Sequence, residues 1–312
     1  MSSVTVVGAG VVGMSIAHEL ATAGHRVRIL ASEPATAGVS AVAAAIWFPH
    51  DVRRSPAVLE SAAVAYQRFQ RLAAVPGTGV HMRAGTVITR RPDADLSWTS
   101  AVPAHTIRPG GVRCVVPLIQ TDVYLAWLRT AIHDLGVRVR TATVCSLPDD
   151  EVVVVAAGIR SAELLGDTDV FPIRGQVVRL ANPGLTDWIT DEDNPDGLTY
   201  VVPRRDDVVC GGTGEHGNWS TRPDPAIEEA ILRRVRALVP ELTGQPILSR
   251  AAGLRPGRSS VRVEPVPGHG RPVFACYGHG GAGFTLSWGD AARIAAMIAG
   301  ETAAGETAAG EQ

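Results

Sequence analysis

The stretch that decides the fold is Thr5-Val6-Val7-Gly8-Ala9-Gly10-Val11-Val12-Gly13, near the amino terminus. Residues 4–7 form a short β-branched run, residues 11–23 follow a helical pattern, and residues 27–31 form a second apolar run. A GxGxxG turn between a strand and a helix lets the backbone approach a pyrophosphate, which binds at the helix N-terminus. The sequence therefore predicts a Rossmann-like βαβ unit whose nucleotide contacts are Gly8, Ala9, Gly10, Val11, Val12 and Gly13.

An acidic side chain is expected about 20 residues after such a turn, where it binds the ribose hydroxyls. Glu33 stands at that distance from Gly13, and Ser32 beside it offers a hydroxyl for the same role. Both residues are therefore candidates for the ribose contact.

A second glycine-rich loop, Tyr277-Gly278-His279-Gly280-Gly281-Ala282-Gly283, follows the apolar run 273–277. A helix is expected after it, to about residue 299. A second helix N-terminus at a nucleotide site suits the pyrimidine end of a flavin, where negative charge develops on reduction. The loop therefore favours FAD over NAD, although an NAD-linked dehydrogenase stays an alternative.

The remaining pattern predicts two interleaved domains of an α/β protein. The first is a Rossmann-like domain of residues 1–50, 112–171 and 267–312, and the second is a domain of residues 51–111 and 172–266 built on an antiparallel sheet. Helices are expected over 55–74, 121–135 and 225–239. Further strands are expected over 137–141, 151–156, 173–180, 198–202, 208–211, 248–254 and 261–266.

Composition excludes several classes of protein. The formal net charge of −2 favours neither nucleic acid nor an anionic membrane surface. No apolar run is long enough to span a membrane and no signal peptide is apparent, so a cytoplasmic location is expected. The four cysteines show no CxxC spacing or metal-ligand pattern, which predicts buried free thiols and no metal site. The repeated Glu-Thr-Ala-Ala-Gly at 301–310 is expected either to extend the last helix or to fray as a disordered terminus.

Several motifs together resemble the D-amino-acid oxidase family. They are the first glycine turn, Val-Ala-Ala-Ala-Ile-Trp at 42–47, Arg-Gly-Gln at 174–176, Gly-Gly-Thr at 211–213, Gly-Asn-Trp at 217–219, Gly-Leu-Arg-Pro at 253–256 and Tyr-Gly-His-Gly-Gly-Ala-Gly-Phe-Thr at 277–285. The match covers almost the whole chain in the same order. The resemblance implies non-covalent FAD, a D-amino acid substrate, oxygen as the electron acceptor and hydrogen peroxide as a product. A homodimer is common in this family.

The resemblance also assigns roles to residues. Arg255 would bind the substrate α-carboxylate through its guanidinium fork, together with the Tyr200 hydroxyl. The backbone carbonyl of Gly281 would accept a hydrogen bond from the substrate amine, and Thr285 would contact the flavin C2 oxygen. The other expected cofactor contacts are Ser40, Ala44, Ala45, Ile46, Gly158, Gly278, His279, Gly280, Gly283 and Phe284.

The sequence departs from the family pattern in the substrate pocket. Asp196 occupies the place of a second lid tyrosine, within an acidic segment, and Phe48 follows the tryptophan where a polar residue is common. Phe48 favours neutral or hydrophobic substrates, whereas Asp196 would favour a basic one if it points inward. D-aspartate is disfavoured because no arginine or histidine is evidently placed to receive a second carboxylate.

The expected reaction is oxidative deamination by transfer of the Cα hydride to flavin N5, with the amine neutral. Orientation and electrostatics would carry this step without a side-chain base, and His279 is expected to be structural. The alternatives are a glycine or sarcosine-type amine oxidase, a D-amino-acid dehydrogenase that reduces a quinone, and a non-catalytic flavin-binding protein.

Overall fold

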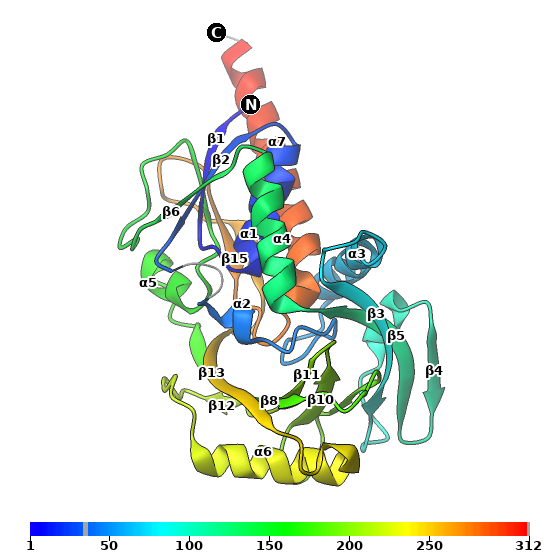
Figure 1. The fold of residues 1–312 in the computed structure, drawn as a ribbon. Helices are drawn as coiled ribbons and strands as arrows, with labels where there is room; N and C mark the ends of the chain where they lie inside the picture. Colours follow the sequence, from blue (N-terminus) through cyan, green and yellow to red (C-terminus); the bar gives the residue numbers. More distant parts are fainter. Residues whose placement is uncertain (34–36, 311–312) are drawn as a thin grey trace.

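The chain folds around two β-sheets that lie one above the other (Figure 1). The structure is a computed structural model, and it describes residues 1–33 and 37–310, with side chains described as far as Glu301. Within these residues no helix is long and apolar enough to cross a membrane. The chain crosses between the sheets four times, because β1 and β2 lie in the first, β3 to β5 in the second, β6 and β7 in the first, β8 to β13 in the second, and β14 and β15 in the first.

The first sheet has six strands and carries the expected βαβ unit. All neighbours are parallel except the antiparallel pair of β14 and β15. The strand order is β14 (Arg262–Pro265), β15 (Val273–Tyr277), β7 (Val152–Val155), β1 (Ser3–Val7), β2 (Arg26–Ala31) and β6 (Arg138–Thr141). Because β7 is all valine, it is buried on both faces, as parallel central strands are.

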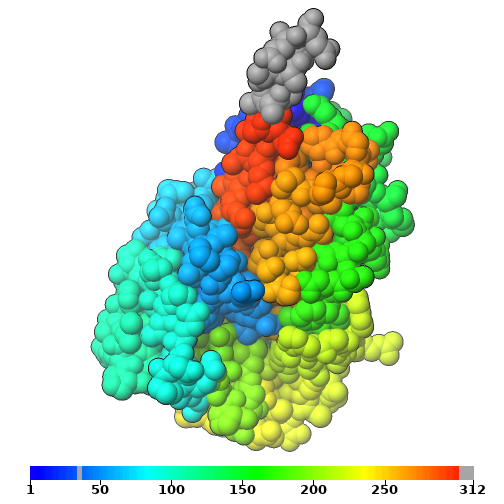
Figure 2. All heavy atoms as spheres, turned by 180° about the vertical axis from the view of Figure 1, so that it is seen from behind, coloured from blue at the N-terminus to red at the C-terminus, as the bar shows by residue number. Residues whose placement is uncertain are grey.

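Three helices cover one face of this sheet: α1 (Val11–Thr22), α4 (Thr121–Asp134) and α7 (Gly283–Gly310) (Figure 1). The short helix α5 (Ser161–Leu165) belongs to the apolar cluster on the other face. Seen from behind, α7 descends between the β14–β15 segment and the helix α3 (Pro56–Leu72) (Figure 2). The indole N–H of Trp288 on α7 donates to the hydroxyl of Tyr124 on α4 across 3.0 Å. α7 continues to Gly310, so the terminal repeat extends the last helix, which is one of the two expectations for it.

The second sheet has nine strands and is antiparallel except where β3 pairs with β9. Its order is β12 (Glu215–His216), β8 (Phe171–Ala181), β11 (Asp207–Gly211), β10 (Thr199–Pro203), β9 (Trp188–Asp191), β3 (Val80–Ile88), β5 (Gly111–Ile119) and β4 (His105–Arg108), with β13 (Ile247–Gly257) paired to β8. The remaining elements are α2 (Val39–Val42), α6 (Pro225–Leu238) and the 3-10 turns Ser97–Ala101, Gly158–Arg160 and Pro240–Leu242.

Alternation along β10 gives the second sheet two different faces. Val201 packs in the cluster with the α6 residues Ile231 and Val235, on the face away from the first sheet (Figure 1). Tyr200 and Val202 point to the opposite face and pack with residues from the 39–46 segment. The face that carries Tyr200 is therefore the one turned toward the first sheet.

Two strands lie in a different sheet from the one that the sequence division implied. β5 was expected in the Rossmann-like domain but pairs with β3 and β4, and β14 was expected in the second domain but pairs with β15. Residues 111–119 are mostly apolar, whereas residues 262–265 are Arg-Val-Glu-Pro, and each strand pairs with a neighbour close in sequence, β5 with β4 and β14 with β15. The apolar pattern alone therefore does not predict which sheet either strand joins. We propose that the domain boundaries follow the sheets at these two positions.

Cys145 is exposed, contrary to the expectation that all four thiols are buried.

Candidate active site

A cavity of about 360 Å³ lies between the two sheets, at the carboxyl ends of the parallel strands. This is where open α/β sheets bind ligands. Residues expected from both the nucleotide and the substrate site line it together. They are Gly8, Ala9, Gly10, Val11, Val12, Ser32, Glu33, Ser40, Ala44, Ala45, Ile46, Phe48, Gly158, Tyr200, Arg255, His279, Gly280, Gly281, Gly283 and Phe284.

The first glycine turn has the geometry of a pyrophosphate cradle. Gly8 has a φ of +116°, and a Cβ there would lie 2.3 Å from the carbonyl oxygen of Ala156. A Cβ at Gly13 would lie 2.1 Å from the carbonyl oxygen of Gly8, so Gly13 allows the helix to pack on the strand and does not line the cavity. No side chain caps α1 at Gly10, and Ser40 accepts a hydrogen bond from Val11 N over 3.1 Å. These features fit a dinucleotide such as FAD.

The ribose end of the cradle lies at the end of β2. Ser32 and Glu33 both line the cavity there, and both side chains are exposed. A hydroxyl and a carboxylate can each accept hydrogen bonds from ribose hydroxyls. The geometry therefore leaves both residues available to bind the ribose.

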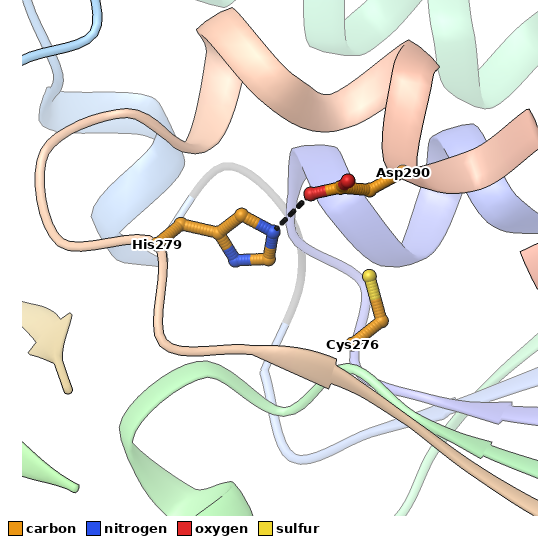
Figure 3. Close-up of side chains that lie close together, drawn as sticks. All are labelled: Cys276, His279 and Asp290. Carbon is orange, nitrogen blue, oxygen red and sulfur yellow. Dashed lines mark hydrogen bonds and ion pairs between the residues drawn. The ribbon is translucent and has the colours of Figure 1, made fainter. Parts of the chain in front are cut away.

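The second glycine loop is anchored on α7 by a buried hydrogen bond. The Nε2 of His279 lies 3.0 Å from Oδ2 of Asp290, and the imidazole ring turns toward α7 (Figure 3). The other carboxylate oxygen of Asp290 accepts hydrogen bonds from Ser61 over 2.6 Å and Arg293 over 3.1 Å. This network holds the loop against the helix and supports the structural role expected for His279.

Cys276 lies beside the same pair, with its ligand atom and those of His279 and Asp290 within 4.8 Å of one another (Figure 3). The sequence analysis found no cysteine placed with a histidine in this way, because it tested spacing and not the fold of the loop. Both oxygens of Asp290 already accept hydrogen bonds, one of them from a guanidinium. Burial also raises the pKa of the Cys276 thiol, which opposes the thiolate that binds metals. The cluster therefore has the character of a hydrogen-bonded anchor.

Replacing His279 with alanine should destabilise the fold and leave the chemistry intact. Asp290 would lose one partner in a buried site, which costs about 3 kcal/mol of unfolding free energy. Denaturant unfolding of wild type and variant measures that cost, and kcat/KM of the FAD-replete variant should stay within about twofold of wild type. A loss of tenfold or more at full FAD occupancy would instead show that His279 takes part in the reaction.

Besides Gly13, two expected cofactor contacts are absent from the lining of the cavity. Thr285 donates its hydroxyl to the Phe48 carbonyl at 2.8 Å and accepts from Phe48 N at 3.1 Å, so it joins α7 to the segment after Trp47. Gly278 packs instead against Arg258, whose Cβ would lie 2.9 Å from a Cβ at that glycine. Thr285 thus positions Phe48, and its contact with the flavin stays a prediction.

Arg255 on β13 and Tyr200 on β10 meet at the opposite end of the cavity. The Arg255 guanidinium lies beside the Tyr200 hydroxyl and donates from Nη1 to the carbonyl of Thr213 over 2.8 Å. Burial raises the pKa of Tyr200 while the positive charge of Arg255 opposes that rise, so the hydroxyl stays a proton donor. A guanidinium and a phenol in an apolar cavity can bind a carboxylate.

Glycines make room for both of these side chains. A Cβ at Gly211 would lie 2.1 Å from Cζ of Tyr200, and a Cβ at Gly175 would lie 2.6 Å from Nη2 of Arg255. These glycines belong to two of the family motifs, Arg-Gly-Gln at 174–176 and Gly-Gly-Thr at 211–213. The motifs therefore make room for the two side chains that form the carboxylate site. Neither motif contributes a charged group to the cavity, since Arg174 is buried on Glu215 and Gln176.

A methyl group at Gly175 should move the Arg255 guanidinium with little effect on stability. The clash falls on the end of a flexible side chain, so unfolding free energy should change by about 1 kcal/mol or less. Loss of the aligned fork should raise KM about tenfold, which corresponds to one charge-assisted hydrogen bond. Steady-state kinetics of Gly175→Ala against wild type checks this, and an unchanged KM would contradict it.

The structure separates Asp196 from the cavity and brings in two residues that the sequence analysis missed. Asp196 is exposed, and its carbonyl accepts a hydrogen bond from Arg234, so it does not point inward. His50 and Glu192 line the cavity in its place and pair through Nδ1 and Oε1. Neither residue belongs to a recognisable motif. The acidic segment that contains both Glu192 and Asp196 was the one sequence signal that could have pointed to Glu192.

Comparison with known proteins agrees with this geometry. A family model described as FAD dependent oxidoreductase matches residues 3–297. A D-amino-acid oxidase from Rubrobacter xylanophilus is 45% identical over 94% of this chain and 94% of its own length. The chain belongs to the D-amino-acid oxidase family of FAD-dependent oxidoreductases. A D-amino-acid oxidase from Streptomyces coelicolor is 38% identical over 94% of this chain and 96% of its own, and a human D-aspartate oxidase is 30% identical over 95% and 94%.

Two solved structures share the fold of this chain. Glycine oxidase from Bacillus cereus superposes with a TM-score of 0.80 over 96% of both chains, at 23% identity. Iminodiacetate oxidase from Chelativorans superposes with a TM-score of 0.78 over 95% of both chains, at 18% identity. At these identities the likeness concerns the fold, and it confirms the mixed α/β class expected from the sequence.

Proposed function

We propose that this member of the D-amino-acid oxidase family catalyses the oxidative deamination of D-amino acids to 2-oxo acids, ammonia and hydrogen peroxide. The observation that carries the proposal is the meeting of Arg255 and Tyr200 in the same cavity as the glycine cradle. The 45% identity to a D-amino-acid oxidase over most of both chains supports it.

The roles follow from the positions of the groups. Arg255 and Tyr200 bind the α-carboxylate, and the Gly281 carbonyl accepts a hydrogen bond from the amine, so that two ends of the substrate are held. The glycine cradle would hold FAD non-covalently, and the flavin would supply the acceptor for the Cα hydride, with oxygen as the final electron acceptor.

We infer a preference for neutral or hydrophobic side chains. Phe48 is buried and lies edge-on to Trp98 at 5.2 Å, and Val177 and Leu198 line the cavity with it. Glu192 on the same wall would repel a second carboxylate. His50 also lines the cavity and would favour an acidic side chain, but it is already paired with Glu192.

A substrate panel with the purified holoenzyme tests the proposal. Peroxide should form with D-alanine, D-valine and D-methionine and not with their L-enantiomers, and D-aspartate should be a poor substrate. Peroxide mainly with glycine or sarcosine would indicate an amine oxidase instead. Anaerobic bleaching of the flavin without peroxide would indicate a dehydrogenase. The absence of both bleaching and peroxide would contradict catalysis at Arg255. A homodimer and a cytoplasmic location stay predictions, and sedimentation of the holoenzyme tests the first.

A further inference from the structure

Arg234 lies on α6 and is a buried cation outside the active-site cavity. It is 8% exposed and lines a second hollow of about 510 Å³, the outer hollow, which shares His50, Glu192 and Leu198 with the cavity. Burial lowers the pKa of its guanidinium, and the positive charge of Arg233 lowers it further. The free-energy cost of burying this charge must be offset by the hydrogen bonds that Arg234 donates.

The hydrogen bonds of the Arg234 guanidinium go to neutral oxygens on two neighbouring segments. Nε donates to Oγ1 of Thr199 over 3.2 Å, and Nη1 donates to the carbonyl of Asp196 over 3.2 Å. Nη2 donates to the carbonyl of Leu198 over 3.3 Å and to that of Gly212 over 2.9 Å. The first three acceptors lie where the acidic segment enters β10, and the fourth lies just after β11. Arg234 therefore joins these two segments.

The same two segments carry the carboxylate site. On the first, Tyr200 comes directly after Thr199. On the second, Thr213 comes directly after Gly212. The carbonyl of Thr213 accepts a hydrogen bond from Nη1 of Arg255 over 2.8 Å. Tyr200 and the partner of Arg255 thus each lie one residue away from a contact of the buried guanidinium.

Gly212 lies at the centre of this arrangement. Its N–H donates to the Leu198 carbonyl over 2.9 Å, which extends the antiparallel pairing of β10 with β11. A Cβ at Gly212 would lie 2.8 Å from Cε1 of Tyr200, so the phenol ring rests against this backbone. A shift of this glycine would therefore move both the support of Tyr200 and the hydrogen-bond partner of Arg255.

We propose that Arg234 is a positioning residue for the substrate carboxylate, which fixes the separation between the Tyr200 hydroxyl and the Arg255 guanidinium. This proposal rests on the proposed function and deepens it. The rigid planar fork of a guanidinium reaches several acceptors at once, so one side chain can hold both segments in a single arrangement. Arg234 does not line the cavity, and it acts through the backbone that carries the two carboxylate-binding groups. A displacement of about 1 Å at such a site can cost up to about 100-fold.

Arg234→Leu tests the proposal, with Arg233→Leu as the matched control, because Arg233 is the exposed neighbour on the same helix. In the holoenzyme, KM for D-alanine should rise about tenfold while kcat stays within about twofold, because the carboxylate is bound alike in the ground state and the transition state. The dissociation constant of benzoate, a carboxylic acid without an amino group, should rise by the same factor, as measured from the flavin absorbance. Arg233→Leu should match wild type.

Two further measurements separate positioning from damage to the fold. The affinity of the Arg234→Leu apoprotein for FAD should equal that of wild type, because the glycine cradle lies at the other end of the cavity. Arg234→Lys should recover part of the loss in benzoate affinity, since an ammonium can reach some of the acceptors but lacks the fork. A fall in FAD affinity with unchanged benzoate affinity would overturn the proposal.

A double-mutant comparison shows whether Arg234 acts through Tyr200. In Tyr200→Phe the hydroxyl that Arg234 positions is already absent, so adding Arg234→Leu should raise the benzoate dissociation constant about threefold and not tenfold. An equal rise in both backgrounds, or no rise in either, would overturn the role of Arg234. Arg234→Lys in the same two backgrounds decides the question if Arg234→Leu fails to fold. A wild type that is inactive on every D-amino acid would overturn the proposed function, and benzoate affinity would still decide the role of Arg234 in carboxylate binding.

Discussion

Replacing Arg255 with leucine should lower kcat/KM for D-amino acids roughly 1000-fold, corresponding to about 4 kcal/mol of lost transition-state binding. The guanidinium is the positive group that faces the cavity beside Tyr200, and without it the substrate carboxylate would be buried without a counter-charge. Leucine preserves most of the apolar stem, so the fold should persist. FAD content should stay at one per chain, because the glycine cradle lies at the other end of the cavity.

Arg250→Leu is the matched control for this change. Arg250 lies on the same strand, is largely exposed and pairs with Glu228 outside the cavity. The Arg250→Leu variant should retain wild-type kinetics. Arg255→Lys should recover only part of the loss, because an ammonium lacks the planar fork. Steady-state kinetics at several substrate concentrations measures all three, and a loss of less than tenfold in Arg255→Leu would contradict the carboxylate role.

Replacing Gly10 with valine should yield protein that is folded but colourless. Gly10 has an ordinary φ of −72°, and a Cβ there would meet only the Ser40 hydroxyl, at 3.2 Å. Its side chain would project into the cavity where the pyrophosphate approaches. Overpacking of this kind costs about 3 kcal/mol, which would weaken FAD binding roughly 100-fold.

Gly10→Ala supplies the graded control, because its methyl group is smaller and should weaken FAD binding by less. Flavin absorbance per chain and titration of the apoprotein with FAD measure the affinity. Far-ultraviolet circular dichroism of the apoprotein should match that of wild type without FAD. Wild-type FAD affinity in Gly10→Val would show that the pyrophosphate lies elsewhere.

Local chemistry made the nucleotide end of the site readable from sequence. Gly8 needs a positive φ and a close approach to Ala156, and no other residue type satisfies both, so the turn left a signature in the sequence. The run of valines in β7 likewise reports its burial on both faces. Such features depend on neighbours along the chain or on residue type alone, and the structure agrees with them.

Features that depend on tertiary contacts could not be predicted from the sequence. The pairing of β14 with β15 could not be predicted, because Arg-Val-Glu-Pro at 262–265 has no apolar pattern that assigns the strand to either sheet. Asp196 and Glu192 lie in one acidic segment, and only the turn through Asn194, whose side chain hydrogen-bonds Asp196 N, decides which carboxylate faces the cavity. His50 carries no motif, and its position becomes significant only when the second glycine loop packs against it.

The fourfold passage of the chain between the two sheets limits how the molecule can come apart. A protein cut once between its domains can separate into two independent bodies, but no single cut in this chain would release either sheet. Each sheet is completed by strands that the chain reaches only after building part of the other. The glycine cradle and the substrate site at Arg255 and Tyr200 should therefore fold and unfold together in a single cooperative transition. Neither sheet should be obtainable as an autonomously folding fragment.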